Sequence, residues 1–147
     1  MPSLSAKSRP NVVFVVFPNV KLLDVAGPMQ VFSDARVNKR ETYEITLVSA
    51  EGGDQLTDTG VVLSTQPLSA WRGRPIQTLL MAGGFGAFPA AKDTFLLDGV
   101  KELASQADRV GSVCTGALIL AAAGLLDGCR AVLTGQFVMI LPRSTQM

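Results

Sequence analysis

The stretch from Arg109 to Gly124, RVGSVCTGALILAAAG, restricts the possible folds of this chain more than any other segment. It predicts a short strand that ends at Val113 and a helix of small residues that begins just after Cys114. A nucleophilic side chain on a sharp turn from strand to helix is typical of a nucleophile elbow in α/β proteins. The start of the helix would favour a thiolate and hold an anion. The alternative is a buried cysteine that packs as a small apolar side chain.

Strands and helices alternate along the rest of the 147 residues. The predicted strands are 12–17, 43–50, 78–82 and 130–134, with a pair of short strands within 55–63, and the predicted helices are 29–35, 93–107 and 115–123. This alternation predicts one α/β domain with a parallel sheet and helices on both faces. Pro28 is expected in the first turn of the first helix. Phe95 is expected on the apolar face of the second helix, with Leu96, Val100 and Leu103.

Three features follow predicted strands at the same edge of this sheet, namely Asp24, the pair Gly83-Gly84 and Cys114. In open parallel sheets, ligands bind beyond the carboxyl ends of the strands. The sequence therefore predicts a site that combines a carboxylate, a closely approaching backbone and a thiol. The glycines do not follow the spacing of a dinucleotide-binding or a phosphate-binding loop, so we expect no nucleotide cofactor.

The composition excludes several classes of function. The formal net charge is +1 and no run of one sign occurs, which argues against a nucleic-acid interface. The chain has no histidine, so Cys-His and Ser-His mechanisms and the usual zinc arrangements are excluded within it. No secretory signal precedes Asn11, and the apolar run 12–17 is too short to span a membrane, so we expect a cytoplasmic protein with reduced Cys114 and Cys129.

The loop 67–75 contains the only tryptophan, Trp71, which is followed by Arg72 and Arg74. One interpretation is a basic and aromatic binding patch. The alternative is a surface loop that the tryptophan anchors to the core, and this is the commoner role of such a residue.

Two segments resemble a known family. Residues 17–28, FPNVKLLDVAGP, are similar to the opening motif of the ThiJ/PfpI superfamily, and residues 112–128, with SVCTGA and AAGLLDG, are similar to its elbow and following helix. The resemblance covers Asn11 to about Ala131 and implies a flavodoxin-like sheet of the class I glutamine amidotransferase type. Two branches share these motifs, the isocyanide hydratases and the N-terminal domain of AraC-type transcriptional regulators. Residues 23–32 and 48–50 look slightly closer to the regulator branch.

The resemblance implies a role for each site residue. Cys114 matches the nucleophile or sensor thiol, Asp24 matches its acidic partner, and the backbone N–H groups of Gly84 and Thr115 match an anion-binding pair. The first functional hypothesis is a ligand- or redox-sensing domain of an AraC-type regulator without its helix-turn-helix. The second is an isonitrile hydratase-like lyase, in which the thiolate attacks an isocyanide and the product is an N-substituted formamide. Either function involves a small molecule and requires no cofactor or metal.

The end of the chain departs from the family pattern. After Gly128 the family continues with a histidine-containing motif and further elements of the sheet, whereas this chain has Val132 to Met147. We therefore expect a single domain over 1–147 with disordered residues 1–10, an atypical tail 132–147 and an altered or missing C-terminal part. The apolar run Phe137–Leu141 predicts association, at least as a homodimer.

Overall fold

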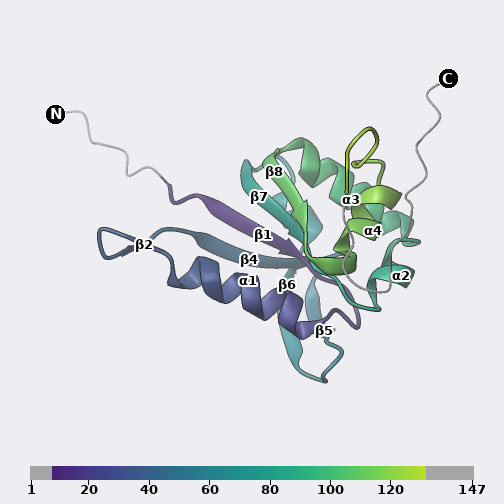
Figure 1. The fold of residues 1–147 in the computed structure, drawn as a ribbon, viewed down its shortest axis with the longest axis horizontal. Coiled ribbons are helices and arrows are strands. Elements are labelled where there is room, and N and C mark those ends of the chain that lie inside the picture. Colours follow the sequence, from purple (N-terminus) through teal and green to yellow (C-terminus); the bar gives the residue numbers. More distant parts are fainter. Residues whose placement is uncertain (1–7, 132–147) are drawn as a thin grey trace.

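The computed structural model describes residues 8–131, which form a six-stranded sheet with helices packed against it (Figure 1). The strands lie in the order β5-β6-β4-β1-β7-β8, and all neighbours are parallel except β5 and β6. Their bounds are β1 Asn11–Val15, β4 Glu44–Ser49, β5 Gly53–Leu56, β6 Val62–Pro67, β7 Ile76–Met81 and β8 Ala107–Ser112. The helices are α1 Leu22–Asp34, α2 Ala87–Ala90, α3 Thr94–Ser105 and α4 Ala117–Ala122. The predicted α/β class and largely parallel sheet are confirmed.

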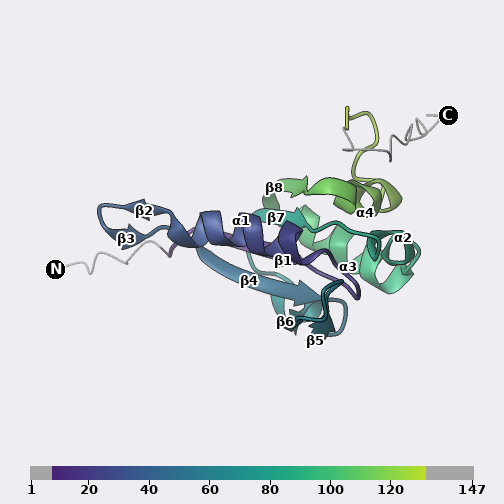
Figure 2. The ribbon, with the colours of Figure 1, turned by 60° about the horizontal axis from the view of Figure 1, so that its bottom comes forward.

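β1 lies in the centre of the sheet because its apolar residues are suited to burial on both faces. Figure 2 shows α1 alongside the β1–β4 part of the sheet, with α4 at the β7–β8 end. Phe14 of β1 packs edge-to-face on Phe32 of α1, at 6.3 Å between ring centroids. Its neighbours Val13 and Val15 belong instead to the main core, with the buried residues of α3. Both faces of β1 are thus buried.

α1 begins earlier than the sequence predicts, because its N-terminus is capped from another segment. The backbone N–H of Leu22 donates to Oδ1 of Asp58, which lies between β5 and β6, at 3.0 Å. Pro28 is therefore in the middle of the helix and not in its first turn. Proline removes the N–H that would have bonded the carbonyl of Asp24, and the helix continues with this one bond missing.

α3 matches its prediction closely, since its own N-cap is local. Oδ1 of Asp93 accepts hydrogen bonds from the backbone N–H groups of Phe95 and Leu96, at 3.1 and 3.3 Å. Leu96, Val100 and Leu103 are buried in the core as expected. Phe95 is not, because 56% of it is exposed. The apolar face of α3 therefore excludes Phe95.

Two connections between the main elements have a defined structure. Residues 36–41 form the hairpin of β2 Arg36–Val37 and β3 Arg40–Glu41. Asn38 and Lys39 at its tip both have positive φ, as a tight hairpin turn requires. In the loop 67–75, Trp71 is buried and the Arg74 guanidinium lies 3.8 Å from its ring centroid, which confirms the anchoring interpretation.

The ends of the chain lie largely outside the described residues. The structure does not describe residues 1–7 or the tail 132–147, which includes the apolar run. Most of the strand predicted at 130–134 also lies outside the described residues, and its two described residues, 130–131, are not in a strand. Over residues 8–131, no helix is both long and apolar enough to cross a membrane.

Candidate functional site

Cys114 lies on a sharp turn directly after β8. Its φ angle is +51°, in the left-handed backbone region that residues other than glycine and asparagine rarely adopt. The turn continues as a short 3-10 helix over Cys114–Gly116 and then as α4. A Cβ atom on Gly116 would lie 2.5 Å from the carbonyl oxygens of Met81 and Ala82, so only glycine fits there. This strained backbone is the geometry of a nucleophile elbow.

The helix after the elbow is shorter than predicted. α4 has six residues, and it follows a 3-10 turn that includes Cys114 itself. Neither cysteine is in a disulfide; Cys114 is half-buried and Cys129 is exposed.

Asp24 lies in the first turn of α1 and carries an unusual carboxyl group. Its Oδ2 atom is buried and has no hydrogen-bond partner among the described residues. Burial raises the pKa of Asp24 above its ordinary value, the charge of Lys21 opposes this, and the charge of Asp58 adds to it. Asp24 therefore keeps its proton to a higher pH than an exposed aspartate does, and the proton is available to a group beside it.

Gly83, at the end of β7, brings this carboxyl group next to the elbow. A Cβ atom on Gly83 would lie 2.8 Å from Oδ2 of Asp24. The same atom would lie 2.7 Å from the carbonyl oxygen of Val113 and 2.9 Å from the backbone nitrogen of Thr115. Since Val113 and Thr115 flank Cys114, the Asp24 carboxyl group lies beside the elbow. The structure thus brings together Asp24, the glycine pair and Cys114, which are far apart in the sequence.

The glycine pair is attached to the elbow by the side chain of Thr115. The N–H of Gly84 donates to Oγ1 of Thr115 at 2.8 Å, and this hydroxyl donates to the carbonyl oxygen of Gly84 at 2.9 Å. In this conformation the Gly84 N–H is occupied, so anion binding by it would require the Thr115 hydroxyl to turn away. The anion-binding roles of Gly84 and Thr115 stay predictions.

Two neighbours of the site were not found from the sequence. The N–H of Lys21 donates to the carbonyl oxygen of Gly83 at 2.9 Å, which fixes the start of α1 against the glycine pair. Asp58 caps α1 and acts on the pKa of Asp24. Neither residue has a local motif that marks this role, because the loops that carry them meet only in the folded chain.

Comparison with known proteins places this geometry in a family. The sequence model of the DJ-1/PfpI family matches residues 10–140. An uncharacterized protein from the cpoL 5' region of Streptomyces lividans is 39% identical over 132 residues, which are 90% of this chain and 92% of that protein. The isonitrile hydratase of Pseudomonas putida is 34% identical over 130 residues, 88% of this chain but 54% of the hydratase. This chain therefore spans about half the length of that relative.

Two further similarities concern a regulator and a solved structure. An HTH-type transcriptional regulator of Mycobacterium tuberculosis is 44% identical over 54 residues, 37% of this chain and 21% of the regulator. The crystal structure of a ThiJ/PfpI family protein from Pseudomonas syringae has a TM-score of 0.73 and 26% identity, over 86% of this chain and 54% of that one. The elbow, the sheet and these matches lead to one conclusion: the chain belongs to the DJ-1/PfpI family.

Proposed function

We propose that this domain senses a small electrophile or oxidant through the thiol of Cys114, as the sensing part of an AraC-type regulator. The observation that carries the proposal is the buried, unpartnered Oδ2 of Asp24 beside a cysteine of positive φ. A fold loses stability when a buried oxygen has no hydrogen-bond partner. It also loses stability when a residue other than glycine is held in the left-handed backbone region. Such costs at one place are typical of sites kept for chemistry. The similarity to the mycobacterial regulator supports the sensing role.

The sensing step uses the proton of Asp24. With a hydroperoxide, the thiolate sulfur attacks the outer oxygen and the O–O bond breaks. The Asp24 carboxyl group protonates the departing oxygen, so the products are a sulfenic acid on Cys114, an alcohol or water, and the Asp24 carboxylate. Because burial raises the pKa of Asp24, its neutral form exists over a wider pH range and does not repel the thiolate.

The test compares the two cysteines of the same chain. Intact protein is treated with hydrogen peroxide or iodoacetamide over a range of pH, and the modified cysteine is identified by peptide mass spectrometry. We expect Cys114 to react first and Asp24→Asn to change its pH profile, while Cys129→Ser leaves that profile unchanged. Preferential modification of Cys129 would contradict the proposal. Tight, specific binding of duplex DNA by this chain alone would contradict a purely sensing role.

The second candidate function is hydration of an isocyanide, favoured by the 34% identity to isonitrile hydratase and by the protonatable Asp24. The thiolate would bond to the isocyanide carbon while Asp24 delivers a proton to the same carbon, giving a thioimidate. Water then adds across the C=N bond, and its hydroxyl proton passes to Asp24 as the C–S bond breaks. The products are the N-substituted formamide, the thiolate and protonated Asp24, so the cycle is closed.

The assay for this candidate supplies cyclohexyl isocyanide and measures N-cyclohexylformamide by gas chromatography. A hydratase would give product with the natural chain and none with Cys114→Ala. Equal product from both proteins, or none from either, would remove this candidate and leave the sensing proposal unaffected.

A further inference from the structure

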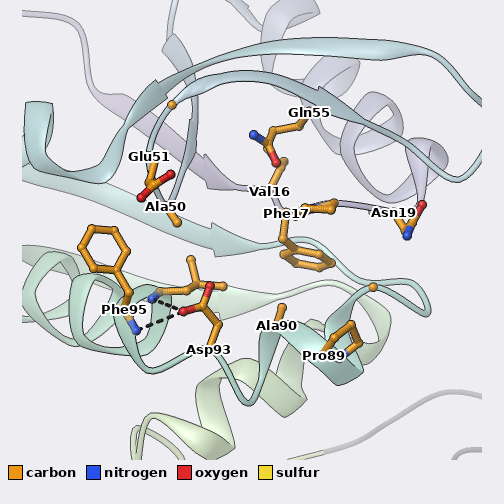
Figure 3. A pocket seen from close by; sticks show the side chains of 14 residues that line it. Val16, Phe17, Asn19, Ala50, Glu51, Gln55, Pro89, Ala90, Asp93 and Phe95 are labelled. Carbon is orange, nitrogen blue, oxygen red and sulfur yellow. Dashed lines mark hydrogen bonds between the residues drawn. The ribbon is translucent and has the colours of Figure 1, made fainter.

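A separate cavity lies beside the β1–α1 connection, whose residues Phe17, Pro18 and Asn19 help to line it. It has a volume of about 510 Å³ and lies among the ends of β1 and β4, the start of β5, α2 and the start of α3 (Figure 3). None of its lining residues is part of the site around Cys114 and Asp24. Its volume is within the range of small-molecule sites. Nothing in the chemistry proposed for Cys114 uses this space.

The cavity combines an apolar floor with polar side chains at its walls. The floor consists of buried or half-buried apolar residues: Val16, Phe17, Ala50, Ala90 and Leu96. Glu51 and Gln55 line it from the β4–β5 region, and Asp93 lines it from the start of α3. In Figure 3 the Glu51 and Asp93 carboxylates come from opposite walls. A ligand in this cavity would meet negative charge around a hydrocarbon surface.

The charge of the lining is one-sided. The lining residues include two carboxylates, Glu51 and Asp93, and neither lysine nor arginine. Among the described residues, Glu51 forms no ion pair. Asp93 uses Oδ1 to cap α3, so its Oδ2 is left for a ligand. The partly exposed ring of Phe95 lies beside these groups, and an aromatic face attracts a cation.

We propose that this cavity binds a small organic ammonium ion, a primary amine with a short apolar or aromatic group. The ammonium would donate hydrogen bonds to Glu51 and Asp93, and the apolar group would cover the Phe17 side of the floor. An anion would be repelled by both carboxylates. A metal ion fits less well, because residues 8–131 contain no group of three or more side chains that could ligate one.

The test uses the 147-residue chain and benzylammonium chloride, with benzyl alcohol and benzoate as matched neutral and anionic probes. Isothermal titration calorimetry measures the affinity at millimolar probe concentrations. We expect benzylammonium to bind and the other two probes to bind at least several-fold more weakly. Glu51→Gln and Asp93→Asn should each weaken benzylammonium binding about fivefold, the size typical of a partly exposed ion pair.

Matched variants keep this result interpretable. Asparagine is as good a helix cap as aspartate, so Asp93→Asn should retain α3 and the folded circular dichroism spectrum. Asp98→Asn removes an exposed charge from the same helix outside the cavity and should not change the affinity. Cys114→Ala should also leave it unchanged, which separates this proposal from the function of the elbow. Equal binding of benzyl alcohol, full affinity in both carboxylate variants, no binding of benzylammonium, or loss of binding in Cys114→Ala would each overturn the proposal.

Discussion

The two long helices, α1 and α3, place an aspartate near their N-termini and use it in opposite ways. Asp93 precedes α3 and accepts two backbone hydrogen bonds, so it stabilises its own helix. Asp24 lies inside the first turn of α1, where Asp58 already caps the helix, and its buried Oδ2 has no partner. The same residue type thus caps one helix and has a buried, unpartnered oxygen in the other. The difference arises because a distant residue has taken over the capping of α1.

The largest expected effect concerns two glycines, Gly83, which packs against the Asp24 side chain of α1, and Gly99 in α3. Gly83→Ala would place a Cβ atom under 3 Å from Asp24, Val113 and Thr115, two of the contacts being to backbone atoms that cannot move easily. We expect a loss of about 3 kcal/mol in the free energy of unfolding, the upper end for overpacking, measured by urea denaturation.

Gly99→Ala in α3 is the matched control. Its Cβ would meet the Cδ1 methyl of Leu68 at 2.6 Å, the end of a flexible side chain. Alanine also gains about 1 kcal/mol of helix propensity over glycine, so we expect a nearly neutral change. Equal destabilisation by the two variants would show that the region around Gly83 has no special packing.

The next prediction separates the two aspartates by stability. Asp93→Ala removes a helix cap and should lower the free energy of unfolding by about 1 kcal/mol. Oδ2 of Asp24 makes no hydrogen bond to the described residues, so Asp24→Ala should not destabilise the fold through the loss of one. Thermal unfolding of both variants at neutral pH checks the difference. If Asp24→Ala costs as much as Asp93→Ala, then Asp24 has a structural role after all.

The third prediction concerns the pH dependence of stability. The pKa of Asp24 is raised by burial, so the folded state favours its protonated form. The contribution of Asp24 is most favourable below the ordinary aspartate pKa, and it is lost as the pH rises through the higher folded pKa. Asp24→Asn should therefore raise the melting temperature at neutral pH, by about 2 °C, and have little effect in acid. A variant curve parallel to that of the natural chain at every pH would contradict this.

The smallest expected effect is electrostatic. Asp58→Asn keeps an oxygen that can cap Leu22 but removes the charge that helps to raise the pKa of Asp24. The Asp24 pKa, followed by carbon-13 NMR of the carboxyl group, should fall slightly, because solvent screens the interaction between the two carboxylates. Asp54→Asn, a change to another exposed aspartate in the same hairpin, should leave this pKa unchanged. A rise in the Asp24 pKa on Asp58→Asn would refute the assigned direction.

Sequence-based prediction succeeded for α3 but not for the start of α1, because the cap of α3 is local and that of α1 comes from a distant segment. The cap of α3 directly precedes the helix and the apolar spacing is regular, so the helix and its core residues Leu96, Val100 and Leu103 were predictable, although Phe95 was not. α1 was placed seven residues too late, because Pro28 looked like a first-turn proline and the cap at Asp58 has no local signal. The proximity of Asp24, the glycine pair and Cys114 could be predicted, because the carboxyl ends of parallel strands meet at one edge of the sheet. The cavity was not predicted, since it needs side chains from four segments that no single motif connects.

The cap of α1 also affects the order of folding. Leu22 and Asp58 are 36 residues apart in the chain, and the strands β5 and β6 on either side of Asp58 must pair before it is held in place. During synthesis, α1 would leave the ribosome before its cap exists, whereas α3 emerges directly after Asp93. We expect α3 to be able to form early from local contacts, and α1 to become stable only when the hairpin docks. The unpartnered carboxyl group of Asp24 is then assembled late, as one of the last parts of the domain to reach its final place.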